Sequence, residues 1–160
     1  MIIRYVDSIN ILIIQTLYNH STITWIDVKL LNLLTIDDNT DTTEAITDYC
    51  KNNGIDCQVA NEGQEGLLAI QNQDYDLILL DIGMPDYCGF DILNQLKKQG
   101  VRYKSIVILT AWNLNIESFK DYMELGVREI IKKPIGLDRL DNVVKSHLMN
   151  VGITIYEKYI

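Results

Sequence analysis

Five polar residues with the chemistry of a phosphoryl-transfer site each follow a run of apolar sequence. They are Asp37, Asp38, Asp81, Thr110 and Lys133. If the runs are parallel strands, these side chains meet at the edge of the sheet where open α/β folds bind ligands. Three carboxylates that close together repel one another and need a cation, and all-oxygen ligands suit Mg²⁺. Asp81 would then attack phosphorus as a carboxylate nucleophile, while the hydroxyl and the ammonium contact the phosphoryl oxygens.

The strongest of these runs is Leu77–Leu80, which is apolar throughout. It is too short for a separate helix and is followed by Gly83 and Pro85, which predicts a strand buried on both faces. Asp81 lies at the carboxyl end of this strand. Taken alone, Asp81 could equally cap the following turn, a common role of aspartate. The presence of matching side chains at the ends of other strands decides between these two interpretations.

Further apolar runs alternate with segments of helical periodicity. Strands are predicted at 30–36, 55–59, 77–80, 105–110 and 127–131. Helices are predicted at 41–54, after 61, and at 90–100, 116–126 and 137–148, the first beginning with a capping box at Asp41–Glu44. This alternation predicts an α/β fold, a doubly wound five-stranded parallel sheet of flavodoxin-like order 2-1-3-4-5 with helices on both faces.

The composition indicates one folded domain and excludes several classes of protein. The chain has 160 residues, of which 48% are hydrophobic and 22% charged, the balance of a soluble protein with a single core. The net charge of −8 argues against direct contact with nucleic acid, which requires clustered Lys and Arg. Cys50, Cys57 and Cys88 lack C-x-x-C spacing, so we expect small apolar residues in a reduced, cytoplasmic setting rather than a zinc or disulfide framework.

The two ends of the chain do not follow the alternating pattern. We interpret 1–28 as an N-terminal extension of unknown role, 29–148 as the domain and 149–160 as a short C-terminal tail. The stretch Ser8–Ile26 has no charged residue, but amides and hydroxyls interrupt it, so neither a membrane span nor a signal peptide is predicted. An added helix or strand, a dimerising arm and translated upstream sequence remain open for the extension. The tail is too short for an output domain.

The motifs around the site match a known family. Asp81–Pro85 reads Asp-Ile-Gly-Met-Pro and is followed by Gly89, and Lys133 directly precedes Pro134. Together with the acidic pair and the strand-terminal threonine, these motifs make 29–148 resemble a response-regulator receiver domain of two-component signalling. About 120 of the 160 residues are covered by this resemblance.

The resemblance implies a role for each of these residues. Asp81 would be the phosphoacceptor, Thr110 the switch hydroxyl and Lys133 a contact of the phosphoryl group, with a cis peptide between Lys133 and Pro134. The Mg²⁺ site would comprise Asp38, Asp81, the main-chain carbonyl of Gly83 and, acting through water, Asp37. The donor would be a phosphohistidine on a sensor histidine kinase or a histidine phosphotransfer protein. The chain would catalyse only its own phosphorylation and dephosphorylation, and would not be an enzyme with an external substrate.

Two features depart from the usual pattern of that family. Ile130 occupies the position in the fifth strand where the family usually has Tyr or Phe, so an inward swing of an aromatic ring cannot transmit the signal. Gly83 and Trp112 flank the expected route of attacking water, two residues beyond Asp81 and Thr110 respectively. A bulky Trp112 could shield an acyl phosphate, and Gly83 has no side chain to position water, so we expect a long-lived phosphoryl group.

Each site residue taken alone has a structural interpretation, and it is their joint placement that favours phosphorylation. One alternative is a receiver-shaped interaction module that works without phosphorylation. A less favoured one is an aspartyl-nucleophile phosphatase, because Gly83 stands where a second Asp would serve as acid. A flavin or nucleotide site is disfavoured because no Gly-rich loop follows the first strand. Output is expected through contact with an unidentified protein, and a homodimer through the face of the fourth helix, fifth strand and fifth helix remains open.

Overall fold

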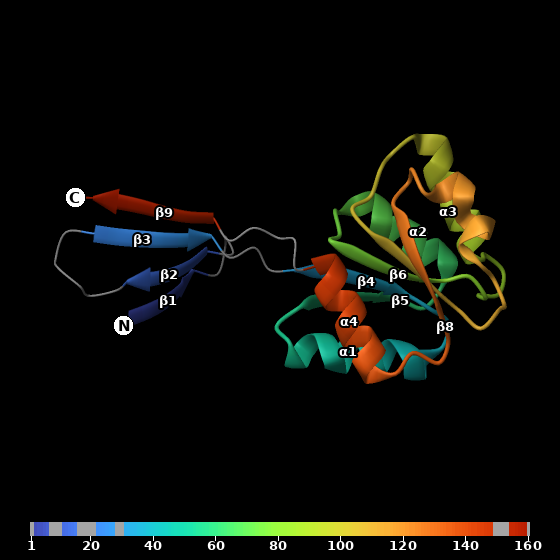
Figure 1. Ribbon diagram of the computed structural model, residues 1–160, viewed down its shortest axis with the longest axis horizontal. Helices are drawn as coiled ribbons and strands as arrows, with labels where there is room; N and C mark the ends of the chain where they lie inside the picture. The colour runs from blue at the N-terminus through green and yellow to red at the C-terminus, as the bar shows by residue number, and fades with distance from the viewer. Residues whose placement is uncertain (1, 7–10, 16–21, 28–30, 149–153, 160) are drawn as a thin grey trace. The chain divides into compact units, whose positions relative to one another are not determined.

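The computed structural model describes residues 2–6, 11–15, 22–27, 31–148 and 154–159 (Figure 1). The chain divides into two compact units, one of Leu31–Met149 and the other of Met1–Leu30 together with Asn150–Ile160. The sequence indicated one core with an extension and a tail. The structure instead joins the two ends of the chain in a unit of their own.

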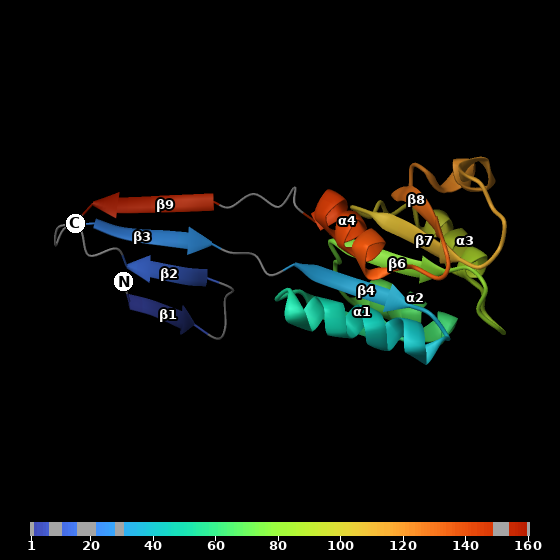
Figure 2. The same cartoon turned by 60° about the horizontal axis from the view of Figure 1, so that its bottom comes forward.

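The larger unit is a five-stranded parallel sheet with helices on both faces (Figure 2). Its strands are β4 Asn32–Ile36, β5 Asp56–Ala60, β6 Leu77–Asp81, β7 Ile106–Thr110 and β8 Val127–Lys132. Its helices are α1 Thr40–Asn52, α2 Gly63–Asn72, α3 Gly89–Gln99, the 3₁₀ helix η1 Ile116–Tyr122 and α4 Leu137–Leu148. The strand order β5-β4-β6-β7-β8 confirms the predicted 2-1-3-4-5 arrangement.

Burial explains why the central strands are apolar without interruption. Every residue of β6 and β7 is buried, because both faces of the sheet are covered. Side chains from α2, α3 and η1 form the core on one face, and those from α1 and α4 form the core on the other. The edge strands β5 and β8 are only partly buried. Polar residues at the ends of the central strands are therefore held on a rigid frame.

Two helices differ from the prediction. The first helix begins at Thr40, and its N-cap is Asn39, whose side chain accepts a hydrogen bond from the Thr42 amide at 3.0 Å, so the expected capping box at Asp41–Glu44 is wrong. The predicted fourth helix is the 3₁₀ segment η1. Only one residue of η1, Phe119, is buried, where it stacks on Phe90 with ring centroids 5.2 Å apart. One buried side chain offers little packing to stabilise a longer α-helix.

The smaller unit is a four-stranded antiparallel sheet built from both ends of the chain. Its strands are β1 Ile2–Val6, β2 Ile11–Gln15, β3 Thr22–Asp27 and β9 Thr154–Tyr159, in the order β1-β2-β3-β9. The last strand pairs with β3 over six residues, from Thr22 opposite Tyr159 to Asp27 opposite Thr154. The segment expected to be a short C-terminal tail thus contributes the fourth strand of a sheet whose other three strands come from the N-terminal extension. In the described part of the chain, no helix has the length and apolarity that crossing a membrane requires.

Candidate functional site

Three carboxylates gather at the carboxyl edge of the parallel sheet. Asp37 directly follows β4, Asp81 is the last residue of β6, and these two strands are neighbours. One carboxylate oxygen from each of Asp37, Asp38 and Asp81 lies within 4.8 Å of the others. Asp37 and Asp81 are buried, whereas Asp38 is exposed. The acidic trio predicted from the sequence is therefore brought together, with one member facing solvent.

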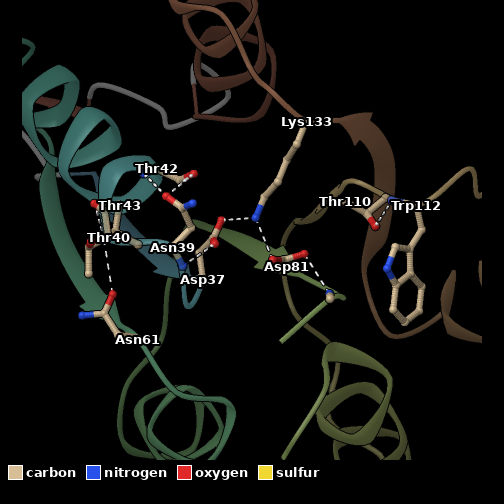
Figure 3. A network of polar contacts seen from close by, with 11 residues as sticks. Asp37, Asn39, Thr40, Thr42, Thr43, Asn61, Asp81, Thr110, Trp112 and Lys133 are labelled. Atoms are coloured by element: carbon tan, nitrogen blue, oxygen red, sulfur yellow. Dashed lines mark hydrogen bonds and ion pairs between the residues drawn. The ribbon is translucent and has the colours of Figure 1, made fainter. Parts of the chain in front are cut away.

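Lys133 bridges the two buried carboxylates (Figure 3). Its Nζ lies 2.6 Å from Asp81 Oδ2, to which it donates a hydrogen bond, and 2.6 Å from Asp37 Oδ2. The lysine follows β8, and its amide donates to the Thr110 carbonyl at 2.9 Å, which fixes its backbone beside β7. The peptide between Lys133 and the exposed Pro134 is cis, as the resemblance implied. The side chain is only 15% exposed, so its charge acts mainly within the site.

Burial and charge have opposing effects on the pKa values of this cluster. Burial raises the pKa of the Asp37 carboxyl, although Lys133 and the Asn39 amide act in the opposite direction. Burial by itself would lower the pKa of Lys133, but Asp37 and Asp81 outweigh it and raise that pKa above its ordinary value. Lys133 therefore stays a cation at neutral pH, where it is the positive charge held between two buried carboxylates.

Backbone amides hold the other oxygens of both buried carboxylates. Asp37 Oδ1 accepts a hydrogen bond from the Asn39 amide at 3.0 Å, and Asp81 Oδ1 accepts one from the Gly83 amide at 2.9 Å. The first of these contacts comes from the turn that starts α1. Sequence reasoning did not single out Asn39, although a residue type favoured at N-caps two positions after an aspartate was the available signal.

Thr110 lies at the end of β7, next to the strand that carries Asp81. Its side chain is buried, and its Oγ1 accepts a hydrogen bond from the Trp112 amide at 3.1 Å. In Figure 3 the hydroxyl lies on the far side of Asp81 from Asp37, and no interaction is drawn between Thr110 and the carboxylates. The hydroxyl proton is thus available for a group that arrives beside Asp81.

Trp112 and Gly83 border the Asp81 carboxylate. A Cβ added to Gly83 would lie 3.7 Å from Trp112 Nε1 and 3.6 Å from Asp81 Oδ1, so the indole nitrogen reaches the space above the acid. Trp112 is half-exposed. Ile130 of β8 pairs with Ile108 and packs partly buried against the core on the α2 and α3 face. It also lines a cavity of about 380 Å³ that reaches Thr110 and Trp112.

The donor atoms of this edge fit a small hard cation. All three side chains offer carboxylate oxygens, the preferred ligands of Mg²⁺. Asp37 Oδ2 is buried, and it shares the Lys133 ammonium, 2.6 Å away, with Asp81. The single positive charge of Lys133 does not balance three carboxylates, and a divalent cation beside them would offset the remaining negative charge. The residues that could hold Mg²⁺ are Asp37, Asp38 and Asp81, with the Gly83 carbonyl as a further candidate.

Comparisons with known proteins show the family to which the chain belongs. Residues 33–145 match the family described as the response regulator receiver domain. The chain is 33% identical over 104 residues to the transcriptional regulatory protein CpxR homolog of Haemophilus influenzae. This alignment covers 65% of this chain and 44% of that protein. It is 27% identical over 123 residues to the transcriptional regulatory protein CiaR of Streptococcus pneumoniae, covering 77% and 54%. The chain therefore spans about half the length of these curated relatives.

A solved structure gives the same result for the fold. The receiver domain of response regulator 1452 from Francisella superposes with a TM-score of 0.60 at 29% identity. The superposition covers 72% of this chain and 98% of that one. The larger unit of the chain thus accounts for a whole domain of this kind.

Proposed function

Because the chain belongs to the response regulator receiver family, we propose that it accepts a phosphoryl group on Asp81 from a phosphohistidine of a partner protein, with Mg²⁺ bound beside the acid. The partner would be a sensor histidine kinase or a histidine phosphotransfer protein. Receiver domains are signalling modules, and the chemistry proposed here is limited to the chain's own phosphorylation and dephosphorylation. It has no external substrate.

The observation that carries this proposal is the double contact of Lys133 with the two buried aspartates. A single ammonium lies 2.6 Å from both Asp37 and Asp81, while Asp38 stays exposed within the same acidic cluster. A purely structural ion pair requires one acid for one base. The additional carboxylates indicate a site that is completed by cationic and phosphate ligands.

The residues of this site divide the work of the transfer. A carboxylate oxygen of Asp81 forms the new bond to phosphorus as the bond from phosphorus to the imidazole nitrogen breaks, and the imidazole keeps the electron pair. When bound, Mg²⁺ would neutralise charge on the transferring phosphoryl group. Lys133 and the Thr110 hydroxyl would donate to the phosphoryl oxygens, and the Gly83 amide already holds the Asp81 carboxylate in orientation.

Signal output would follow from movement around Thr110. A phosphoryl group adds about −1.5 to −2 charges and three acceptor oxygens beside this hydroxyl. Thr110, Trp112 and Ile130 line one cavity, so a shift of Thr110 towards the phosphate changes the space next to an aliphatic side chain instead of an aromatic ring. We expect the surface of η1, β8 and α4 to change its arrangement and to contact the target protein.

The test is incubation of the full chain with a small acyl phosphate donor and Mg²⁺, followed by intact mass spectrometry. Wild type should gain one phosphoryl group, and Asp81→Asn should gain none. Asp86→Asn is the matched control, because Asp86 is an exposed acid in the same loop whose positive φ of 59° suits asparagine as well as aspartate. Phosphorylation of Asp81→Asn would disprove the assignment of the nucleophile. A wild type that stays unmodified would favour an interaction module that works without phosphorylation.

A further inference from the structure

The first turn of α2 packs directly against the β6–α3 loop, residues 82–88. A Cβ added to Gly63, the first residue of α2, would lie 2.0 Å from the Tyr87 carbonyl oxygen and 3.0 Å from the carbonyl carbon. The backbone of Gly63 is helical, a conformation open to every residue, and glycine is a poor helix former. Lack of space beside Tyr87 is therefore what excludes a side chain at this position.

The β6–α3 loop carries two main-chain groups of the acidic site. The Gly83 amide donates to Asp81 Oδ1 at 2.9 Å, and the Gly83 carbonyl is a candidate ligand of Mg²⁺. Ile82 and Met84 are buried and anchor the first half of the loop in the core. The contact with Gly63 restrains the second half. The loop is thus held from outside on both sides of its turn.

The turn between these two anchors is tight. The Tyr87 amide donates to the Pro85 carbonyl at 2.6 Å, and Asp86 has a φ of 59°, in the left-handed region. Proline has a fixed φ, so it adds little freedom between Tyr87 and the first half of the loop. A displacement of Tyr87 therefore also moves Pro85 and the segment that contains Gly83.

We propose that Gly63 is a positioning residue for the metal site. By leaving room for the Tyr87 carbonyl, it keeps the β6–α3 loop in place, and with it both main-chain groups of Gly83 beside Asp81. This inference rests on the proposed function, because it takes Mg²⁺ to bind at Asp81. Gly63 is not itself a ligand, and its effect on the cation is exerted through the loop.

The substitution Gly63→Ala should displace the loop without unfolding the larger unit. A methyl carbon needs about 3 Å or more from a carbonyl oxygen, so α2 and Tyr87 would have to separate by about 1 Å or more. Residues 61–64 and 84–87 line a cavity of about 470 Å³, which gives the loop space to move into. A disturbed support of a metal ligand typically costs about tenfold or more in metal affinity.

The test measures Mg²⁺ binding by the fluorescence of Trp112 in a Trp25→Phe background, with stability from urea denaturation of the same chains. Gly63→Ala should raise the dissociation constant for Mg²⁺ about tenfold. Gly126→Ala is the matched control, because its Cβ would lie 2.3 Å from the Tyr103 carbonyl oxygen, at the amino edge of the sheet. The φ of Gly126, 123°, adds strain, so this variant should lose stability and keep the wild-type affinity.

Hydrogen exchange gives a readout that does not require bound metal. In the metal-free chain, Gly63→Ala should speed amide exchange in residues 82–88, and Gly126→Ala should leave this segment unchanged. If Gly63→Ala does not fold, the wild-type chain decides the question. Added Mg²⁺ should slow exchange in residues 61–67 as well as in 82–88, and Asp81→Asn should remove both effects.

Three results would overturn the positioning role of Gly63. They are an unchanged Mg²⁺ affinity in folded Gly63→Ala, an equal loss of affinity in Gly126→Ala, and protection by Mg²⁺ that is limited to residues 82–88. A wild-type chain that does not bind Mg²⁺ would overturn the proposed function, and this inference with it. Failure of the inference alone is therefore distinguished by normal Mg²⁺ binding in the wild type.

Discussion

The two ends of β6 each hold a buried aspartate with a lysine, and they differ in their balance of charge. At the amino end, Asp76 accepts a hydrogen bond from the Asn32 amide at 3.1 Å and pairs with Lys104, whose side chain is 60% exposed. At the carboxyl end, Asp37 and Asp81 share Lys133, which is 15% exposed. At the amino end a single buried carboxylate has both a backbone donor and a lysine, whereas at the carboxyl end two buried carboxylates share one ammonium.

This difference separates a structural pair from a functional cluster. A buried carboxylate with a backbone donor and one cation is satisfied and needs no further ligand. At the carboxyl end, two buried carboxylates and the exposed Asp38 face a single ammonium, so negative charge is left over. The excess charge is at the edge where the loops leave room for a ligand. The predictions below test whether the two ends of the strand differ in function as they do in charge.

The largest expected effect is that of removing the lysine at each end. Lys133→Met should slow phosphorylation by a small donor about 100-fold or more, because a preorganised cation that stabilises transferring charge is worth roughly 3 kcal/mol. Lys104→Met should phosphorylate at the wild-type rate. The measurement is the time course of phosphoryl gain by intact mass, with circular dichroism to verify that both variants fold. Equal rates in the two variants would remove the distinction between the two ends.

The second prediction concerns stability. Asp76→Asn should lower the free energy of unfolding by about 1–3 kcal/mol, because it removes the charge from a satisfied buried hydrogen-bond acceptor. Asp81→Asn should cost less, since the loss of attraction to Lys133 is offset by relief of repulsion from Asp37 and Asp38. Urea denaturation without divalent cations measures both. A larger loss in Asp81→Asn than in Asp76→Asn would mean that the carboxyl end is the more tightly satisfied of the two.

The third prediction uses the position of Trp112 as a local reporter. The chain has two tryptophans, so Trp25→Phe leaves Trp112 as the sole indole, with its nitrogen in the space beside Asp81. Titration with Mg²⁺ should change the fluorescence of this variant in a saturable manner. Adding Asp81→Asn should abolish the change, and adding Asp76→Asn should leave it. A response that survives Asp81→Asn would place the cation elsewhere.

The carboxyl end was predictable from local sequence because its residues are fixed by the strands. Leu77–Leu80 is apolar throughout, which by itself predicts a buried strand. Asp81 must then lie at the carboxyl end of that strand. The same holds for Thr110 after β7. The parallel order follows from the alternation of strands and helices, and it brings β4 beside β6. The position of Lys133 depended additionally on the resemblance to a family.

The sequence did not predict the N-cap of α1, the 3₁₀ form of η1 or the pairing of β3 with β9. These features depend on competing N-cap residues, on how many side chains are buried, or on contacts between segments far apart in the sequence. Asn39 and Asp41 are both residues that favour N-caps, and the turn after Asp37 selected the earlier one. The segment at Ile116–Tyr122 has helical spacing but only one buried side chain, so it forms a 3₁₀ helix. The pairing of β3 with β9 joins segments more than 120 positions apart, and no local pattern specifies such a register.

The smallest expected effect concerns the lifetime of the phosphoryl group at the carboxyl end. Water must approach phosphorus beside Asp81, where the Trp112 indole reaches the space that the missing Gly83 side chain leaves open. Trp112→Ala should therefore speed dephosphorylation by about threefold to tenfold, roughly 1 kcal/mol in the barrier, and Trp112→Phe should have a smaller effect.

The measurement is loss of the phosphoryl group by intact mass after the donor is removed. Leu68→Ala, an exposed apolar change in α2, is the matched control and should leave the lifetime unaltered. Because the shield acts on water and not on the acid itself, Trp112→Ala should still take up one phosphoryl group, and an unchanged lifetime in this variant would show that the indole does not protect Asp81.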